Sequence, residues 1–301
     1  MKFTESWLKK LTEIKPIPTA EKPRLVKLDN IKAVIFDIYG TLLVSSSGDI
    51  NQAEISGNNL KRALRVANAQ FTNPAMEQDD KLIADLLATF VKLIHRHQDH
   101  LREQGTPFPE VDIRKVWEDL FKYATENNII NTSPNTDLTK LTFAFELLSN
   151  KVWPMPGMKK TIEHFHQKGL PLGIVSNAQF YTPIMMNYFL TKTVADADTI
   201  PYFDPELTVF SYKLLMAKPD TSIFQPMLKN LKTKYNISPE QSVFIGNDMY
   251  KDIYPASKMG MKTIFFAGDK RSLRLREDQE EVKGLKPDAV ITKVEQLKQI
   301  I

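Results

Sequence analysis

The stretch VIFDIYGTLL, residues 34–43, decides how the rest of the chain is interpreted. It begins with an apolar run, residues 34–36, that is typical of a short strand buried on both faces of a sheet. The acidic residue Asp37 follows directly, and the pair Gly40-Thr41 comes soon after. A carboxylate in this position raises the question of which partners it meets at the end of the strand.

Length and composition limit the class of protein. A chain of 301 residues favours two domains, or one domain with a large insertion. A hydrophobic content of 42% suits a soluble protein, and no apolar run approaches the roughly 18–20 residues of a membrane span. The N-terminal MKFTESWLKKLTEIKP lacks the apolar segment of a signal peptide. Because the chain also has no cysteine, we expect a cytoplasmic protein without disulfides or thiolate chemistry.

The charge balance argues against a nucleic-acid partner. The net charge is +4, from 40 basic and 36 acidic residues, which is only a slight bias. The sequence has no dense stripe of lysine and arginine interleaved with aromatic residues. We therefore expect neither a nucleic acid nor a membrane as a partner.

Hydrophobic periodicity predicts an N-terminal extension and a helical insertion. Residues 1–30 contain a short amphipathic piece followed by KPIPTAEKP, whose prolines break helices. In residues 47–151 the pattern becomes helical, and residues 79–97 carry apolar side chains every four positions. Two further helices are expected in residues 110–124 and 137–148. We interpret residues 47–151 as an all-helical cap domain.

Residues 31–46 and 152–301 predict an α/β core with a doubly wound parallel sheet. After residue 152, short apolar strands alternate with helices, the pattern of right-handed βαβ units. The helices are expected at residues 158–168, 180–190, 220–235 and 252–259, and the last strand is DAVIT. Because ligands of such sheets bind at the carboxyl ends of the strands, the chemistry is expected there.

Polar residues follow several of these strands. The first strand ends in Asp37, and the second, LGIVS, ends in Ser176 and Asn177. Lys218 lies just before the helix at residues 220–235, and SVFIG is followed by Asn247 and Asp248, with Asp252 four residues later. A carboxylate, a hydroxyl, an ammonium group and an acidic pair are thus predicted to meet at one edge of the sheet.

Each of these residue types has a role in phosphoryl transfer. Asp37 can attack phosphorus and form an aspartyl phosphate. Lys218 would balance the charge between this carboxylate and the phosphate oxygens, which Ser176 or Thr41 and backbone N–H groups would hold. Asp37 and Asp248, with a backbone carbonyl oxygen, suit Mg²⁺. Gly40 would let the backbone approach the phosphate closely. We expect Gly40, Thr41 and Asn177 to bind the substrate, although Asn177 can also simply satisfy the backbone at its strand end.

The segments DIYGTLL, IVSNA, AKPD and IGNDMYKD resemble, in order, the four motifs of the haloacid dehalogenase superfamily. This resemblance covers the core, and the helical block resembles the inserted cap of that family. It implies that Asp37 is the nucleophile, that Ser176 is the hydroxyl of the second motif and that Lys218 is the lysine of the third. It also implies that Asp248 and Asp252 are the acids of the fourth motif, at a Mg²⁺ site.

Tyr39 departs from the pattern of the family's phosphatases. They usually carry a second aspartate there as general acid and base, and the dehalogenase branch, which needs no metal, resembles DIYGT more closely. We give the fourth motif more weight, because clustering Asp37, Asp248 and Asp252 without a cation would be costly. Tyr39 would then offer the metal its backbone carbonyl. Asp252 is expected both to cap its helix and to orient its neighbours.

Three functions follow from these considerations. The first is a Mg²⁺-dependent phosphatase of a small phosphorylated metabolite, with the cap closing over the site. The second is a 2-haloacid dehalogenase, favoured by Tyr39, in which Arg62 or Arg65 would bind the substrate carboxylate. The third is a non-catalytic binding protein on the same fold. The segment VSSSGD, residues 44–49, is either a substrate loop or a plain hinge, and His97 and His100 more often mark a solvated helix face than a metal site.

Overall fold

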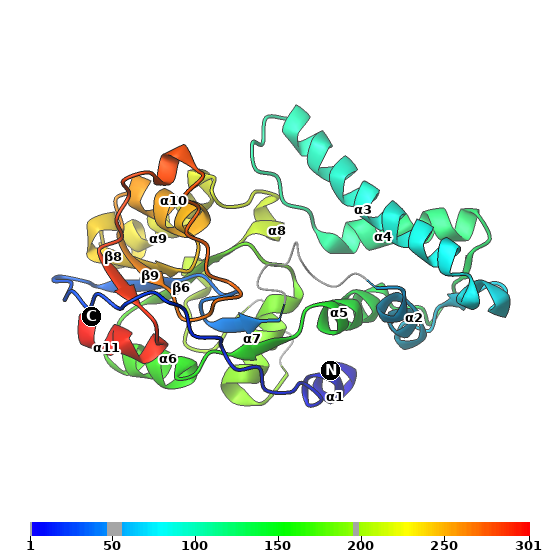
Figure 1. Cartoon of the computed structure of the whole chain (residues 1–301), viewed down its shortest axis with the longest axis horizontal. Helices are drawn as coiled ribbons and strands as arrows, with labels where there is room; N and C mark the ends of the chain where they lie inside the picture. Colours follow the sequence, from blue (N-terminus) through cyan, green and yellow to red (C-terminus); the bar gives the residue numbers. More distant parts are fainter. Residues whose placement is uncertain (1, 47–55, 195–198) are drawn as a thin grey trace.

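A six-stranded sheet forms the centre of the protein in the structure, a computed structural model that describes residues 2–46, 56–194 and 199–301 (Figure 1). The strand order is β10-β9-β8-β1-β6-β7, and every neighbouring pair is parallel. The strands are β1 (Ala33–Phe36), β6 (Leu172–Ser176), β7 (Thr208–Phe210), β8 (Ser242–Gly246), β9 (Lys262–Phe266) and β10 (Ala289–Ile291). The predicted doubly wound parallel sheet is confirmed.

Helices cover both faces of the sheet, which explains why its strands are continuous apolar runs. Val34 and Phe36 of β1 belong to the core on one face, and Ala33 and Ile35 belong to the core on the other. The first core includes α6 (Met158–Gln167), α7 (Tyr181–Thr191) and α11 (Leu297–Ile300). The second includes η4 (Thr221–Phe224), α9 (Gln225–Tyr235) and α10 (Tyr254–Lys258).

The chain changes direction within the sheet at β1. From β1 it continues to β6 and β7 on one side, and it then returns to β8 on the other side of β1. Such a reversal opens a crevice at the carboxyl ends of the two diverging strands, where ligands of doubly wound sheets bind. Asp37 follows β1 at this point.

The N-terminal extension packs against the core. Its helix α1 (Lys2–Leu8) lies against α5 (Leu138–Ser149) and α7, and Leu8 is fully buried. Farther along, the main-chain N–H of Ile17 donates a 2.8 Å hydrogen bond to Asp269, and Arg24 pairs with Val290 of β10. The extension is therefore part of the folded body.

The insertion between β2 (Leu43–Ser45) and β5 (Val152–Pro154) has its own hydrophobic core. At its centre the ring of Trp117 lies 4.5 Å from that of Phe90 and 5.0 Å from that of Phe145, measured between centroids. Its described elements are α2 (Gly57–Val66), β3 (Gln70–Phe71), η2 (Pro74–Gln78), α3 (Asp80–Glu103), α4 (Ile113–Glu126), β4 (Ile130–Asn131) and α5 (Leu138–Ser149). In Figure 1 it extends sideways from the sheet.

The insertion is mainly helical, but the expectation that it is all-helical is wrong. Strands β3 and β4 form an antiparallel pair, and each is only two residues long. A strand of that length has no periodicity that a sequence could reveal. The predicted boundary at residue 47 stays a prediction, because residues 47–55, and with them most of VSSSGD, lie outside the described part of the chain.

A small ribbon joins the insertion to the core. Strand β2 (Leu43–Ser45) pairs antiparallel with β5 (Val152–Pro154), and the N–H of Ser46 donates a 2.8 Å bond to Lys151. The two chain crossings are thus held side by side, close to the first motif.

The remaining elements are short. They are α8 (Ser211–Leu214), η3 (Pro205–Leu207), η5 (Pro239–Gln241), η6 (Met249–Ile253), η7 (Glu280–Val282) and η8 (Val294–Gln296). The helix expected at 252–259 begins earlier, with the single π-turn η6, and continues as α10. Of the helices in the described part of the chain, none combines the length and the apolar character needed to cross a membrane.

Candidate active site

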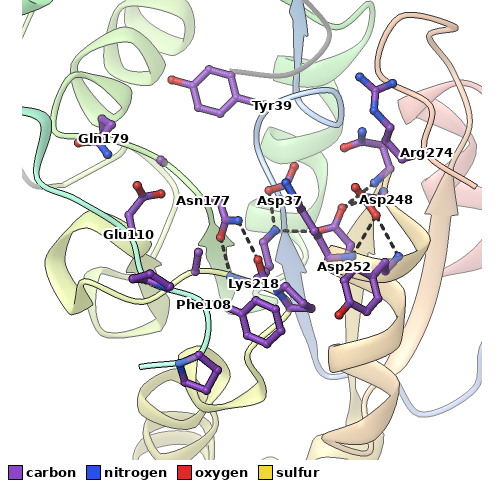
Figure 2. Close-up of a pocket in the computed structure, with 18 of the residues that line it drawn as sticks. Asp37, Tyr39, Phe108, Glu110, Asn177, Gln179, Lys218, Asp248, Asp252 and Arg274 are labelled. Carbon is purple, nitrogen blue, oxygen red and sulfur yellow. Dashed lines mark hydrogen bonds and ion pairs between the residues drawn. The ribbon is translucent and has the colours of Figure 1, made fainter. Parts of the chain in front are cut away.

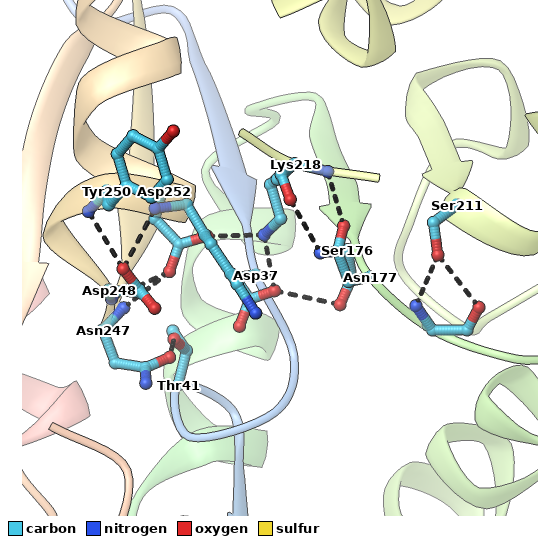
Figure 3. Close-up of polar contacts among 12 residues, drawn as sticks. Asp37, Thr41, Ser176, Asn177, Ser211, Lys218, Asn247, Asp248, Tyr250 and Asp252 are labelled. Carbon is cyan, nitrogen blue, oxygen red and sulfur yellow. Dashed lines mark hydrogen bonds and ion pairs between the residues drawn. The ribbon is translucent and has the colours of Figure 1, made fainter. Parts of the chain in front are cut away.

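Asp37 is buried at the carboxyl end of β1, where two other motifs reach it (Figure 3). Its Oδ1 accepts a 2.9 Å hydrogen bond from the Ser176 hydroxyl and a 2.8 Å bond from Lys218 Nζ. No donor to Oδ2 is found among the described residues. One oxygen of this carboxylate is therefore fixed, while the other is left for a ligand.

Lys218 links Asp37 to the fourth motif. Its Nζ also lies 2.5 Å from Asp252 Oδ1, and its side chain is only 2% exposed. Asn177 fixes the main chain of Lys218, because its Oδ1 accepts from the Lys218 N–H at 2.8 Å and its Nδ2 donates to the Lys218 carbonyl at 3.1 Å. Burial alone would lower the pKa of Lys218, but the carboxylates of Asp252 and Asp37 outweigh it and raise the pKa. The lysine is held as a cation.

Both oxygens of Asp252 are already bonded. Oδ1 accepts from Lys218, and Oδ2 accepts from the main-chain N–H groups of Asn247 and Asp248, each at 3.0 Å. Burial raises the pKa of this carboxyl, and the charges of Asp37 and Asp248 add to the effect. Asp252 thus holds Lys218 and the loop after β8 in place.

Asp248, and not Asp252, caps the helical turn of the fourth motif. Its Oδ1 accepts from the N–H groups of Tyr250 at 2.9 Å and Lys251 at 3.0 Å. The expectation that Asp252 is the N-cap is wrong, because the turn starts at Met249 and places Asp252 inside it. Asp248 also meets Arg276, whose Nη2 lies 2.7 Å from Asp248 Oδ2.

The Gly40-Thr41 pair packs against Asn247. The Thr41 hydroxyl donates a 3.0 Å bond to Asn247 Oδ1, and Asn247 Nδ2 donates to the Ser272 carbonyl at 2.6 Å. Gly40 has a φ of +82°, and a Cβ there would come within 2.6 Å of Asn247 Nδ2. The need for glycine at this position therefore comes from the turn and from Asn247, a packing reason that the sequence did not reveal.

The hydroxyl of Tyr39 points away from Asp37, as Figure 2 shows. It lies 2.8 Å from the Thr182 hydroxyl of α7. Burial raises the pKa of Tyr39 well above its ordinary value, and the charge of Glu146 adds to this. The phenol is therefore placed to pack and not to exchange protons with a group on Asp37.

A cavity of about 370 Å³ lies over Asp37 (Figure 2). Of the predicted site residues, the cavity is lined by Asp37, Tyr39, Asn177, Lys218, Asp248 and Asp252. Ser176 is fully buried behind Asp37, and neither Gly40 nor Thr41 contributes to the wall. The predicted residues thus converge on one site, although the substrate-binding role expected of Gly40 and Thr41 has no support from the cavity.

The insertion supplies a wall of this cavity. Phe108 and Glu110, in the loop after α3, line it. This loop is bound to the third motif, since the Ala217 N–H donates to the Phe108 carbonyl at 2.8 Å and the Glu110 N–H to the Leu215 carbonyl at 3.1 Å. Sequence reasoning missed both residues, because a loop between two helices has no periodicity that marks it as part of a distant site.

The other residues considered from the sequence lie elsewhere. Arg65 pairs with Glu77, and neither Arg62 nor Arg65 lines the cavity. The Nε2 atom of His97 lies 2.9 Å from Asp119, within the insertion. The arginines expected to bind a haloacid are therefore not at the site in this structure.

The oxygen ligands at the site are of the kind that Mg²⁺ prefers. The candidates are the carboxylate of Asp37 and the backbone carbonyl of Tyr39, and both residues line the cavity. Asp248 would complete the set, but both of its oxygens accept bonds from Arg276. The chemistry of the residues fits the ion, provided that Asp248 is released from Arg276.

The fold and the site define an α/β protein with a doubly wound parallel sheet, a buried carboxylate at the end of its central strand β1 and an inserted domain. Residues 31–260 match the model of the haloacid dehalogenase-like hydrolase family. The chain belongs to that family, as the four motifs predicted.

Curated relatives match part of the chain. It is 29% identical over 147 residues to the glyceraldehyde 3-phosphate phosphatase of Pyrococcus furiosus, an alignment that covers 49% of this chain and 54% of that protein. The phosphatase of the same name from Methanothermobacter thermautotrophicus is 28% identical over 148 residues, with coverage of 49% and 58%. The chain thus spans about half the length of these relatives.

A solved structure shares the fold. A 2-haloacid dehalogenase from Pseudomonas syringae has a TM-score of 0.52 and 20% identity, and the comparison covers 90% of this chain and 97% of that one. Because the identity is this low, the likeness concerns the fold alone.

Proposed function

We propose that this protein is a phosphatase that acts on a small phosphorylated metabolite through Asp37. The observation that carries the proposal is the Asp37 carboxylate, whose Oδ1 is held by Ser176 and Lys218 while Oδ2 is left for the cavity. The names of the partial relatives support a phosphate ester as substrate. The insertion supplies part of the cavity wall and would take part in selecting the substrate.

In the first step, Asp37 Oδ2 attacks phosphorus, a P–O bond to the carboxylate forms, and the bond to the leaving oxygen breaks. The leaving oxygen takes a proton from water, because Tyr39 is turned toward Thr182. In the second step, water attacks the phosphorus of the aspartyl phosphate, and the bond between phosphorus and Asp37 Oδ2 breaks to give inorganic phosphate and the free carboxylate. The proton of the attacking water neutralises the hydroxide left in solvent by the first step. Lys218 stabilises the negative charge in both steps, from a position fixed before the substrate arrives.

Mg²⁺ is part of this proposal. Asp37, the carbonyl of Tyr39 and Asp248 would hold the ion, which would neutralise phosphate charge when bound. The bonds of Asp252 to Lys218 and to two backbone N–H groups favour an orienting role over direct ligation. The metal-ligand role predicted for Asp252 from the sequence stays a prediction.

A hydrolysis screen tests the proposal. Wild type and Asp37→Asn would be assayed with glyceraldehyde 3-phosphate, sugar phosphates, aryl phosphates and 2-haloacids, each with Mg²⁺ and with a chelator. We expect phosphate release from at least one ester by wild type with Mg²⁺ and none by the variant. Halide release without phosphate release would establish the dehalogenase alternative.

Failure on the whole panel would favour the non-catalytic alternative, particularly if the protein still bound Mg²⁺. The cytoplasmic location, and the expectation that neither nucleic acid nor membrane is a partner, stay predictions from the sequence.

A further inference from the structure

A segment that no motif marks lies along the fourth motif. The N–H of Arg274 donates a 3.1 Å bond to the Asn247 carbonyl, and the N–H of Met249 donates a 2.9 Å bond to the Arg274 carbonyl. Asp248 and Arg274 therefore lie opposite each other in a short parallel bridge. This pairing fixes the register of the segment and brings the next arginine, Arg276, to the Asp248 side chain.

Arg276 donates hydrogen bonds to the Asp248 carboxylate from two nitrogen atoms. Its Nε lies 3.0 Å from Oδ2 and 3.2 Å from Oδ1, and its Nη2 lies 2.7 Å from Oδ2. The pair is sheltered, since the Asp248 side chain is 8% exposed and that of Arg276 is 29% exposed. Arg276 also has a φ of +55°, a backbone conformation that non-glycine residues adopt at a cost and that its surroundings must hold.

The arginine changes the charge balance of the site. The sequence predicts that the cluster of Asp37, Asp248 and Asp252 needs a bound cation. In the structure Lys218 lies between Asp37 and Asp252, and Arg276 neutralises Asp248. The three carboxylates thus face two cations from the chain itself, with Lys218 shared between Asp37 and Asp252.

We propose that Arg276 competes with Mg²⁺ for Asp248, so that the metal binds only when the arginine leaves the carboxylate. The inference rests on the Mg²⁺ site of the proposed function. Mg²⁺ is usually bound by proteins through one or two carboxylates, and Arg276 donates to both oxygens of Asp248. Arg276 is therefore a positioning residue that keeps the metal-free site stable and weakens its affinity for Mg²⁺.

Calorimetric titration with Mg²⁺ alone tests the exchange. Wild type would be compared with Arg276→Gln, which removes the charge and the fork, and with Arg271→Gln. Arg271 is a matched control, because it lies on the same segment and pairs with a different buried carboxylate, Asp269. We expect Mg²⁺ to bind Arg276→Gln about 10-fold or more tightly than wild type, since a charge-assisted bond no longer has to be broken. The Mg²⁺ affinity of Arg271→Gln should be within about 3-fold of the wild-type affinity, because the charge of Arg271 is farther from the metal site and is screened by salt.

Thermal unfolding provides a second measurement. If Arg276 had only a structural role, its replacement would lower the melting temperature equally with and without Mg²⁺. Without Mg²⁺, Arg276→Gln should melt below wild type, because Asp248 is left without its cation. Saturating Mg²⁺ should then raise the melting temperature of Arg276→Gln more than that of wild type. Arg276→Lys, which keeps the charge but loses the fork, should lie between the two in both measurements.

The outcomes separate this inference from the proposed function. Equal Mg²⁺ affinity in wild type and Arg276→Gln, with phosphatase activity intact, would overturn the exchange and leave the phosphatase standing. An affinity gain of the same size in Arg271→Gln would also overturn it, since the gain would then reflect net charge alone. If neither wild type nor Arg276→Gln binds Mg²⁺, the metal site itself is wrong, whether or not phosphate esters are cleaved.

Discussion

Lys218 Nζ lies 2.8 Å from Asp37 Oδ1, although 181 residues separate them in the chain. Lys218 lies in the loop after α8, and Asp37 follows β1 at the centre of the sheet. The same ammonium group reaches Asp252, so one cation fixes two buried carboxylates. This arrangement leads to predictions about both activity and stability.

Asp37→Asn should reduce turnover by at least about 10³-fold, as expected when a covalent nucleophile is lost. The amide keeps the shape of the side chain and can still accept the bonds from Ser176 and Lys218, so the fold should persist. Steady-state rates on the best substrate of the screen, with far-ultraviolet circular dichroism as a check of folding, measure the effect. A variant that keeps a tenth of wild-type turnover would show that another group attacks.

Lys218→Met should lose activity and also destabilise the protein. Removal of one partner from a buried ion pair costs about 3–5 kcal/mol, because the remaining charge is left uncompensated. Here Asp37 and Asp252 would both lose their cation. Urea unfolding measures the change, with Lys229→Met as the control, since Lys229 is exposed on α9 and should be neutral within about 0.5 kcal/mol. A Lys218→Met protein as stable as this control would contradict the assigned pairing.

Tyr39 should make the enzyme selective for good leaving groups. General acid–base help is worth about 10²–10⁴-fold, and a buried phenol bonded to Thr182 cannot supply it. Wild type should therefore cleave aryl phosphates much faster than simple alkyl phosphates. Tyr39→Asp should raise alkyl phosphate turnover by about 10-fold or more, whereas Tyr39→Phe should change it little.

Both Tyr39 variants would be assayed on matched alkyl and aryl esters. Equal wild-type rates on the two ester classes, or no gain in Tyr39→Asp, would show that proton transfer is supplied by some other group.

Glu146 of α5 should make stability depend on pH. Burial raises its pKa to about 7, although Tyr181 and Asn150 donate hydrogen bonds to it. A glutamate in the unfolded chain has a pKa of about 4.3. Between these values the folded protein binds the extra proton, so the free energy of unfolding falls as pH rises through that window and then levels off.

Glu146→Gln cannot lose that proton and should not show this fall. The difference in unfolding free energy between the variant and wild type should therefore shift by about 1 kcal/mol or more in favour of the variant when the pH is raised from 5 to 8. Urea unfolding at both pH values measures it, with the exposed Glu126→Gln as a control that should follow wild type. A parallel change in all three proteins would mean that Glu146 ionises normally in the fold.

The sequence was sufficient for the core and for the residues that follow its strands. Strand β1 and Asp37, strand β6 and Ser176, and strand β8 and Asp248 all lie where the apolar runs predicted. These features depend on local periodicity and on the rule that parallel strands present their carboxyl ends at one edge. Such information is contained in a few consecutive residues, so it can be read without knowing the packing.

Tertiary structure alone decided what the side chains do there. Only packing turned the Tyr39 phenol to Thr182, brought Glu110 of the insertion to the cavity, and placed Arg276 on Asp248. Arg276 is one of several arginines in RSLRLRED, and nothing in its neighbours distinguishes it. Its contact with Asp248 depends on the backbone pairing between Arg274 and the loop after β8. These two segments are brought together only by folding, so their spacing in the sequence does not reveal the contact. The sequence therefore determined which groups meet at the sheet edge, and the tertiary structure determined which of their atoms remain for a ligand.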